Sequence, residues 1–157
     1  MTLWLDCDGV LADFDKVAND YLSMDSREFE KQFGSEAFWA KLGEIEDFYF
    51  SLPLLPDALI LYEAVKHLDP IILTGVPSQH GTLAHVQKIR WAHKHFGTGQ
   101  LVVTCKSKLK YRFCKPGDVI VDDWPQHRKK WEEAGGIWIP HKSAEDSIAQ
   151  MKELGIL

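Results

Sequence analysis

Two groups of aspartates stand out because each directly follows a short apolar run. Asp6 and Asp8 follow the first such run of the chain. Asp122 and Asp123 follow a later one. Carboxylate oxygens are the ligands that Mg²⁺ prefers in proteins. A carboxylate can also attack phosphorus to form an acyl phosphate, and a second carboxylate nearby can give a proton to the leaving oxygen. The spacing therefore indicates phosphoryl chemistry, with Asp6 as the nucleophile and Asp8 as the general acid and base.

A hydroxyl group and several cations follow two other apolar runs. Thr74 and Gly75 follow one run, and a segment that contains Lys106, Lys108 and Lys110 follows the other. Cations matter because a negative nucleophile can attack a phosphate only when the phosphate charge is offset, which a metal ion and a lysine can do together. Taken alone, the lysine segment would be explained equally well as a solvated loop.

All of these residues lie where the strands of a parallel sheet would end. Short apolar runs bounded by turn residues are typical of strands that are buried on both faces. Five such runs occur, at 3–5, 71–73, 101–103, 119–121 and 137–139. Ligands bind at the carboxyl ends of parallel strands. The sequence therefore predicts that the polar residues after four of these runs gather at one edge of a sheet.

Apolar residues with helical spacing occur between the later runs and after the last one. They occupy the segments 57–67, 78–96, 124–134 and 144–154. Alternating strands and helices imply parallel strands joined by crossover connections. We therefore predict a single α/β domain over residues 1–157, Rossmann-like and doubly wound, with about five mainly parallel strands flanked by helices.

Residues 14–55 interrupt this alternation. The segment is rich in aromatic residues with charges between them, namely Phe29, Phe33, Phe38, Trp39, Phe48, Tyr49 and Phe50. We predict two or three short helices that are inserted after the first strand and form a small cap. Packing of the same aromatic residues onto the edge of the sheet explains the pattern as well, and the two interpretations are compatible.

Three segments resemble motifs of the haloacid dehalogenase (HAD)-like superfamily of hydrolases. Residues 5–14 resemble its first motif, 71–75 its second and 119–123 its fourth. The residues after Asp8, the small insert and the stretch 131–136 are most similar to the 5'(3')-deoxyribonucleotidase group. The resemblance implies a Mg²⁺-dependent phosphatase of the EC 3.1.3 type that works through an aspartyl-phosphate. It also implies a (deoxy)nucleoside monophosphate as substrate.

The resemblance assigns roles to the four acids. Asp6 would be both the nucleophile and a magnesium ligand. Asp8 would be the general acid and base, and its backbone carbonyl would bind the metal. Asp122 would bind magnesium, with Asp123 beside it.

The resemblance also implies a phosphate-binding set. Thr74 would hold the transferring phosphoryl group through its hydroxyl, helped by the amide of Gly75. Lys110 is the favoured phosphate-binding lysine, because the residues after it resemble the approach to the fourth motif. Lys106 and Lys108 stay open as alternatives.

Other functions fit these motifs less well. An Asp-x-Asp pair also binds the metal of nucleotide sugars in sugar-transferring enzymes. A cysteine phosphatase needs an arginine six residues after its cysteine, whereas position 13 is aspartate after Cys7 and position 111 is tyrosine after Cys105. Phosphotransfer to an acceptor other than water is one alternative. A non-catalytic phosphate-binding regulatory domain of the same fold is another, against which the intact acids argue.

Composition indicates where in the cell the protein is expected and which partners it is expected to bind. The chain has 157 residues, a formal net charge of -5 and three cysteines. This charge argues against stable binding to nucleic acid, which normally requires a basic surface, and sparse cysteines fit a reduced cytosolic protein. No run resembles a signal peptide or approaches the roughly 20 apolar residues of a membrane span. We therefore expect a cytoplasmic protein without membrane contact whose partner is a small phosphorylated substrate; a homodimer is compatible with the sequence.

Overall fold

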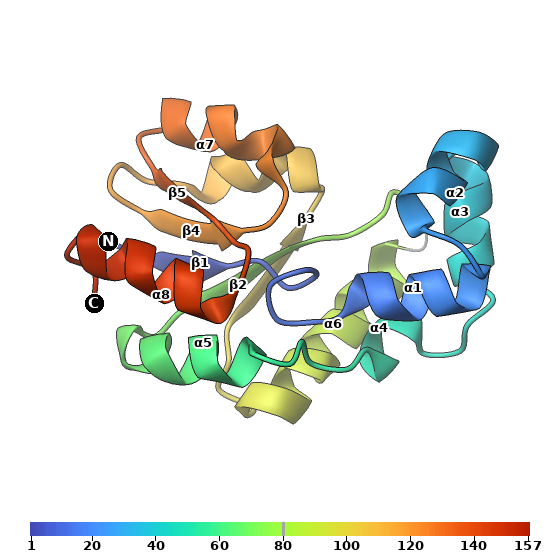
Figure 1. Cartoon of the computed structure of the whole chain (residues 1–157), viewed down its shortest axis with the longest axis horizontal. Coiled ribbons are helices and arrows are strands. Elements are labelled where there is room, and N and C mark those ends of the chain that lie inside the picture. The colour runs from blue at the N-terminus through green and yellow to red at the C-terminus, as the bar shows by residue number, and fades with distance from the viewer. Residues whose placement is uncertain (80) are drawn as a thin grey trace.

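The computed structural model describes residues 1–79 and 81–157, and a five-stranded sheet lies at its centre (Figure 1). The strands are β1 (Leu3–Leu5), β2 (Ile71–Gly75), β3 (Val102–Cys105), β4 (Val119–Asp122) and β5 (Ile137–Pro140). Every neighbouring pair is parallel, in the order β3-β2-β1-β4-β5. The sheet confirms the predicted Rossmann-like α/β class, and each strand contains most of its predicted apolar run.

The strand order brings together residues that are far apart in the sequence. Leu5 pairs with Ile72 on one side and with Val121 on the other. The N–H of Asp6 then donates to the carbonyl of Val121 (2.9 Å). Asp6 and Asp122 therefore leave adjacent strands at the same edge of the sheet.

Helices cover both faces of the sheet. The helices after the insert are α5 (Ala58–Val65), α6 (Gly81–Phe96), α7 (Arg128–Glu133) and α8 (Ala144–Glu153), with the 3₁₀ segments η1 (Lys66–Leu68), η2 (Ser107–Phe113) and η3 (Pro125–His127) between elements. In Figure 1, α5 and α8 lie on one side of the sheet and α7 on the other. The helix predicted at 57–67 therefore ends in a 3₁₀ turn, and the one at 124–134 begins with one. Part of the helix predicted at 78–96, residue 80, lies outside the described residues.

Alternating side chains of the strands form two apolar clusters, one on each face. Leu3 and Leu5 belong to the larger cluster, whereas Trp4 packs with Trp131 and Trp138 in the smaller one. Complete burial of one large apolar side chain stabilises a fold by about 1.5–3 kcal/mol. The packed sheet thus gives the polar edge a rigid support.

Residues 14–55 form four helices, more than the two or three that the sequence pattern predicts. They are α1 (Phe14–Leu22), α2 (Ser26–Phe33), α3 (Ser35–Leu42) and α4 (Phe48–Ser51). The breaks have local causes, because Ser23 after α1 and Gly34 after α2 have positive φ angles (55° and 89°). Asp25 then caps α2 by accepting the N–H groups of Arg27 and Glu28. In Figure 1 these helices lie beyond the carboxyl ends of the strands.

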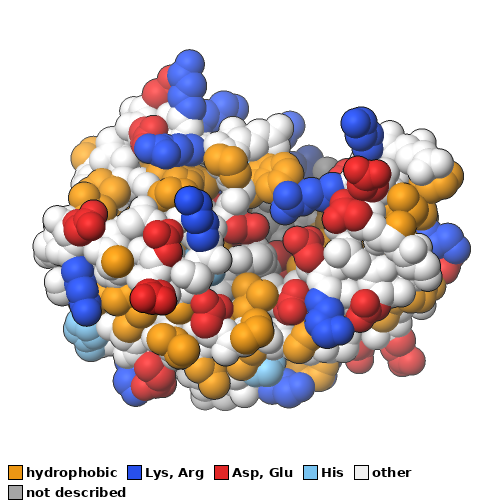
Figure 2. Space-filling model, in the orientation of Figure 1, with side chains coloured by type: hydrophobic (Ala, Val, Ile, Leu, Met, Phe, Trp, Pro, Cys, Tyr) orange, Lys and Arg blue, Asp and Glu red, His pale blue; other side chains and the backbone are white. Residues whose placement is uncertain are grey.

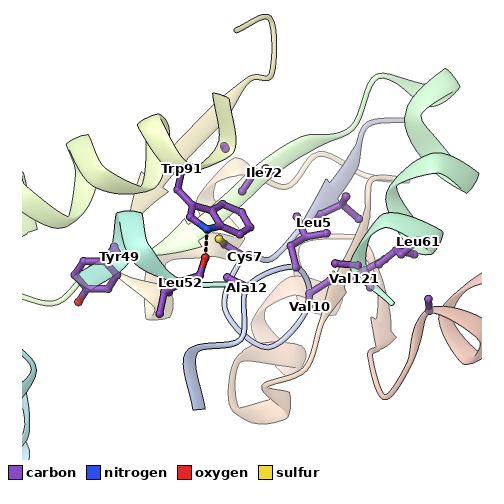
Figure 3. Packing of buried hydrophobic residues seen from close by; sticks show 14 of the residues in the cluster. Leu5, Cys7, Val10, Ala12, Tyr49, Leu52, Leu61, Ile72, Trp91 and Val121 are labelled. Carbon is purple, nitrogen blue, oxygen red and sulfur yellow. Dashed lines mark hydrogen bonds between the residues drawn. The ribbon is translucent and has the colours of Figure 1, made fainter. Parts of the chain in front are cut away.

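The insert is tied to the main core by its last helix. Phe48 and Tyr49 of α4 are buried, so the aromatic residues do pack onto the core as well as cover it. Close by, the indole Nε1 of Trp91 in α6 donates to the carbonyl of Leu52 (2.7 Å), as Figure 3 shows. Within the described part of the chain, no helix is both long and apolar enough to span a membrane.

Candidate active site

The loop after β1 folds back on itself immediately beyond Asp6. The carbonyl of Cys7 accepts the N–H groups of Leu11 (2.8 Å) and Ala12 (2.9 Å). Gly9 has a φ of 81°, in the left-handed region that glycine adopts without strain. A Cβ atom on Gly9 would also collide with the carboxyl group of Asp123. Glycine therefore allows the first loop to lie directly against the second pair of acids.

Lys110 lies between the two central strand ends. Its Nζ is 2.9 Å from Oδ1 of Asp6 and 2.7 Å from Oδ2 of Asp122, and its side chain is 4% exposed. The N–H of Cys7 also donates to Oδ1 of Asp6 (2.8 Å), and that of Trp124 to Oδ1 of Asp122 (2.8 Å). Burial lowers the pKa of Lys110, but the two carboxylates raise it by more. The lysine therefore stays charged and partly offsets the acids.

A second buried lysine, Lys88 of α6, is not among the residues predicted from the sequence. Its side chain is 2% exposed and pairs with the carboxylate of Asp8. Its Nζ also donates to Oγ1 of Thr74 (2.8 Å) and to the carbonyl of Gly75 (2.8 Å). Lys88 therefore connects the end of β2 to the first loop.

The sequence does carry a signal for Lys88. Ala84, Lys88 and Trp91 are spaced four and three residues apart, which places them on one face of a helix. Ala84 and Trp91 are fully buried. A lysine on the apolar face of a helix rarely lies in a protein core without a charged partner, so this position points to a buried site.

Asp8 has one paired and one unpaired oxygen. Oδ2 accepts from Lys88, while Oδ1 is buried and has no hydrogen-bond partner among the residues that the structure describes. Burial raises the pKa of Asp8, and Lys88 offsets only part of this effect. A carboxyl group with a raised pKa and an unpaired oxygen is suited to exchanging a proton with a reactant that reaches it.

Three carboxylates lie close enough together to hold one metal ion. Asp6, Asp122 and Asp123 each offer an oxygen, and these oxygens all lie within 4.8 Å of one another. Burial, reinforced by the nearby Asp6, raises the pKa of Asp122 to about 6 and that of Asp123 to about 7. A cation would relieve this crowding of negative charge, and a set made only of oxygens suits magnesium. The residues present therefore fit a Mg²⁺ ion.

A pocket of about 270 Å³ opens beside the acids. Its lining includes Asp6, Asp8, Gly75, Lys88, Ser107 and Asp123 from the main body, and Phe14, Arg27, Glu30, Phe38 and Trp39 from the insert. Figure 2 shows this face hollowed between the insert and the rest of the molecule, with acidic side chains around the hollow. Thr74, Lys110 and Asp122 are adjacent to the pocket residues but do not line the pocket.

The insert also contacts the main body across this pocket. The guanidinium of Arg27 in α2 lies 4.6 Å from the ring centroid of Trp124, which follows β4. Trp124 lines the same pocket. A cation over an indole face is an attractive contact, so this pair helps hold the insert over the acids.

The structure brings the predicted acids, Thr74 and Gly75 to one place. Of the three candidate lysines, Lys110 lies at the acids, whereas Lys106 and Lys108 are exposed. Gly75 has a steric reason to be glycine, because a Cβ atom there would collide with Oγ of Ser107.

Comparisons with known proteins identify solved structures with a similar fold. A scan against protein-family models found no match, and a search of curated proteins found no significant match. Among solved structures, the chain is similar to a hydrolase from Streptococcus pneumoniae TIGR4, with a TM-score of 0.55, 16% identity, and coverage of 99% of this chain and 98% of that one. It is also similar to a HAD family hydrolase from Deinococcus radiodurans R1 with bound phosphate and sodium, with a TM-score of 0.54, 15% identity, and coverage of 99% and 96%. The chain therefore shares its overall fold with these two hydrolases, one of which is a HAD family hydrolase.

Proposed function

We propose that this protein is a HAD-like phosphomonoester hydrolase that uses Mg²⁺ and forms an aspartyl-phosphate intermediate. The main support is the convergence of four carboxylates and two buried lysines at the carboxyl edge of the sheet, beside one pocket. The fold that the chain shares with two hydrolases supports the same class of activity.

Asp6 is the nucleophile in this proposal. Its Oδ1 accepts from the N–H of Cys7 and from Lys110. We therefore assign Oδ2 as the oxygen that bonds to phosphorus while the leaving oxygen departs. The two donors at Oδ1 fix the orientation of the carboxylate before the reaction, which lowers the cost of reaching the attack geometry.

Asp8 moves the proton in both halves of the reaction. It gives a proton to the leaving oxygen as the aspartyl-phosphate forms, then takes one from the water that attacks this intermediate. Lys88 holds Oδ2 of Asp8, so Oδ1 is the atom that exchanges the proton.

Lys88, rather than Lys110, binds the substrate phosphate. Lys88 lines the pocket together with Gly75 and Ser107, whereas Lys110 does not. Thr74 is fully buried, and its Oγ1 accepts from Lys88. We therefore assign Lys110 to holding Asp6, and Thr74 to positioning Lys88, which revises the roles expected from the sequence.

Mg²⁺ would be held by side chains of Asp6, Asp122 and Asp123, with the backbone carbonyl of Asp8 added by the motif resemblance. Bound there, the ion would offset the charge of the phosphate in the transition state. Lys110 keeps the carboxylates of Asp6 and Asp122 close together through its two ion pairs.

The finer proposal is that the substrate is a (deoxy)nucleoside monophosphate. Phe14, Phe38 and Trp39 line the part of the pocket formed by the insert. Aromatic rings offer faces on which a nucleobase can stack. The predicted cap would then contact the base while the sheet edge binds the phosphate.

A matched pair of variants tests the proposed function. Phosphate release is measured with Mg²⁺ from a panel of nucleotides and sugar phosphates, for wild type, Asp6→Asn and Asp69→Asn. Asp69 is exposed and precedes β2, and its φ of 50° is one that asparagine tolerates. We expect Asp6→Asn to lower kcat at least about 1,000-fold, as loss of a nucleophile does, and Asp69→Asn to match wild type.

Two results of this assay would contradict the proposal. Activity that survives Asp6→Asn excludes the assigned nucleophile. Binding of Mg²⁺ and inorganic phosphate without hydrolysis of any panel member favours a non-catalytic regulatory domain. Repeating the assay with alcohols as added acceptors distinguishes hydrolysis from phosphotransfer.

A further inference from the structure

Glu30 of α2 lines the pocket as part of the insert, whereas Asp6, Asp8 and Asp123 line it from the main body. We propose that Glu30 is a specificity-determining residue that selects phosphomonoesters whose far end carries a nitrogen-bound hydrogen donor, either a protonated amine or the amino group of a nucleobase. This inference rests on the proposed function and adds to it a preference for a hydrogen-bond donor on the leaving group.

The carboxylate of Glu30 has no partner within the protein as described. Its residue is half-buried, and no described residue hydrogen-bonds to its side chain or pairs with it. Partial burial of a charge costs free energy unless the charge is paired or hydrogen-bonded. A ligand that donates hydrogen bonds in the pocket would supply the missing partner.

Arg27 does not neutralise Glu30, although it lies three residues earlier on the same helix. Its nearest carboxylate is that of Asp15, 3.8 Å away. Its guanidinium lies over the ring of Trp124. Arg27 therefore contacts Asp15 and Trp124 rather than Glu30. The carboxylate of Glu30 stays unpaired in the lining of the pocket.

The neighbours of Glu30 in the pocket favour the same ligand chemistry. Phe14, Phe38 and Trp39 line the pocket with it. Aromatic faces next to a carboxylate attract a cation, and they also stack against a flat base whose amino group can reach the carboxylate. A second anionic group on the substrate would be repelled by Glu30.

The main body and the insert thus offer different chemistry to the same pocket. Lys88, Gly75 and Ser107 line it from the main body and would bind the phosphate of a substrate. Glu30 and the aromatic rings line the same cavity of about 270 Å³ from the insert. A cavity of this size suits a small phosphomonoester that contacts both sets of residues.

The test compares substrates that differ only in the donor. The kcat/KM ratio is measured for O-phosphoethanolamine against ethyl phosphate, and for cytidine against uridine 5'-monophosphate, in wild type, Glu30→Gln and Glu28→Gln. Glu28 is exposed on the same helix and does not line the pocket, so it is the matched control. Because each ratio is taken within one protein preparation, it does not depend on the folded fraction.

We expect wild type and Glu28→Gln to prefer the donor-bearing member of at least one pair. Glu30→Gln should reduce that preference about 10- to 100-fold, the effect of losing a hydrogen bond to a charged group. A preference in the first pair identifies an alkylammonium ligand, and one in the second identifies an amino nucleobase. Equal losses for both members of a pair, or no preference in wild type, would overturn the inference.

A binding measurement separates this inference from the proposed function. Calorimetry with Asp6→Asn and Asp6→Asn/Glu30→Gln measures affinity for the same four compounds in the presence of Mg²⁺. If wild type releases no phosphate from any of them or from the nucleotide and sugar phosphate panel, the proposed function fails, and the affinity ratios still decide the role of Glu30. Ratios that do not change with Glu30→Gln would refute that role even in an active enzyme.

Discussion

At the residue scale, the two buried lysines of the site contact different carboxylates. Lys110 pairs with Asp6 and Asp122 and does not line the pocket. Lys88 pairs with Asp8 and lines the pocket itself. The two lysines therefore pair with three carboxylates, and of the two only Lys88 lines the pocket.

Replacing Lys88 tests its assignment to the phosphate. Lys88→Met keeps most of the side-chain volume but removes the charge that would face the transferring phosphoryl group, so we expect kcat/KM to fall about 100- to 1,000-fold. Lys152→Met is the control, because Lys152 is exposed on α8. Steady-state kinetics on the best panel substrate measures this loss. Near-wild-type activity of Lys88→Met would instead assign phosphate binding to Lys110.

The acids were predictable from the sequence, but the pairing of the lysines was not. Asp6 and Asp122 each follow an apolar run, and strand ends are where polar residues of a parallel sheet converge. Lys88 comes from the interior of a helix, so its position depends on how α6 packs rather than on where a strand ends. Lys110 reaches the acids because η2 buries it, and the sequence alone did not separate it from Lys106 and Lys108.

At the element scale, α6 joins the insert to the loop after β1 that contains Asp6 and Asp8. Gln87 accepts the N–H groups of Tyr49 (2.9 Å) and Phe50 (3.3 Å) of α4. The next residue, Lys88, contacts Asp8. One turn later, Trp91 donates to Leu52. A single helix therefore contacts the insert and carries the lysine that we propose binds the phosphate.

Replacing Gln87 should disturb the insert first. Gln87→Ala leaves two N–H groups at the start of α4 without their buried acceptor, which costs about 1–3 kcal/mol. We expect the free energy of unfolding to fall by this amount and KM to rise more than kcat falls. Urea denaturation and kinetics measure both, with the exposed Gln32→Ala as control. An unchanged KM would show that α4 does not depend on Gln87.

Asp118 joins the start of β4 to the start of β1. It accepts the N–H of Thr2 (2.7 Å), the N–H of Lys115 (3.0 Å) and the indole of Trp4 (3.3 Å). Burial raises the pKa of Asp118, but these hydrogen bonds lower it by more, so the pKa lies below its ordinary value. A carboxyl group with a lowered pKa in the folded state stabilises the protein above its unfolded pKa, and this contribution is lost as the pH falls toward the folded value.

Asp118→Asn should therefore cost stability in a pH-dependent way. At pH 7 we expect a loss of about 2 kcal/mol, since the bonds to a charged acceptor become weaker. The difference from wild type should shrink below about pH 4, the ordinary range of an aspartate pKa. Urea denaturation between pH 3 and pH 7 measures it, and a difference that does not change with pH would exclude the charge as its cause.

The elements themselves were only partly predictable. The strands could be placed because apolar runs that are buried on both faces differ clearly from helical periodicity. The number of helices in the insert was wrong because its breaks coincide with single positive φ angles, at Ser23, Gly34 and Asp47, that apolar spacing does not reveal. The interpretation of the insert as a cap stays a prediction.

At the scale of the whole molecule, the fold brings several carboxylates together at the carboxyl edge of the sheet. The lysines offset only part of their negative charge. Asp6, Asp122 and Asp123 share one small region. Lys110 alone does not prevent the pKa values of Asp122 and Asp123 from rising. Mg²⁺ should therefore stabilise the folded chain as well as support catalysis.

Thermal unfolding with and without Mg²⁺ tests this link. A ligand that binds only the folded state raises Tm in proportion to the logarithm of its concentration once the site is saturated. We expect Mg²⁺ to raise Tm of wild type, a chelator to reverse the change, and Asp123→Asn to show a smaller gain. The same gain with sodium chloride at equal ionic strength would attribute the effect to general screening instead.

The proposed covalent intermediate on Asp6 can be trapped directly. Wild-type protein that is turning over its best substrate is quenched in acid and treated with borohydride, which reduces an acyl phosphate to an alcohol. Peptide mass spectrometry then locates the reduced residue. We expect homoserine at position 6 in wild type, and none in Asp6→Asn or in protein without substrate. Continued phosphate release with reduction at another carboxylate, or at none, would contradict it.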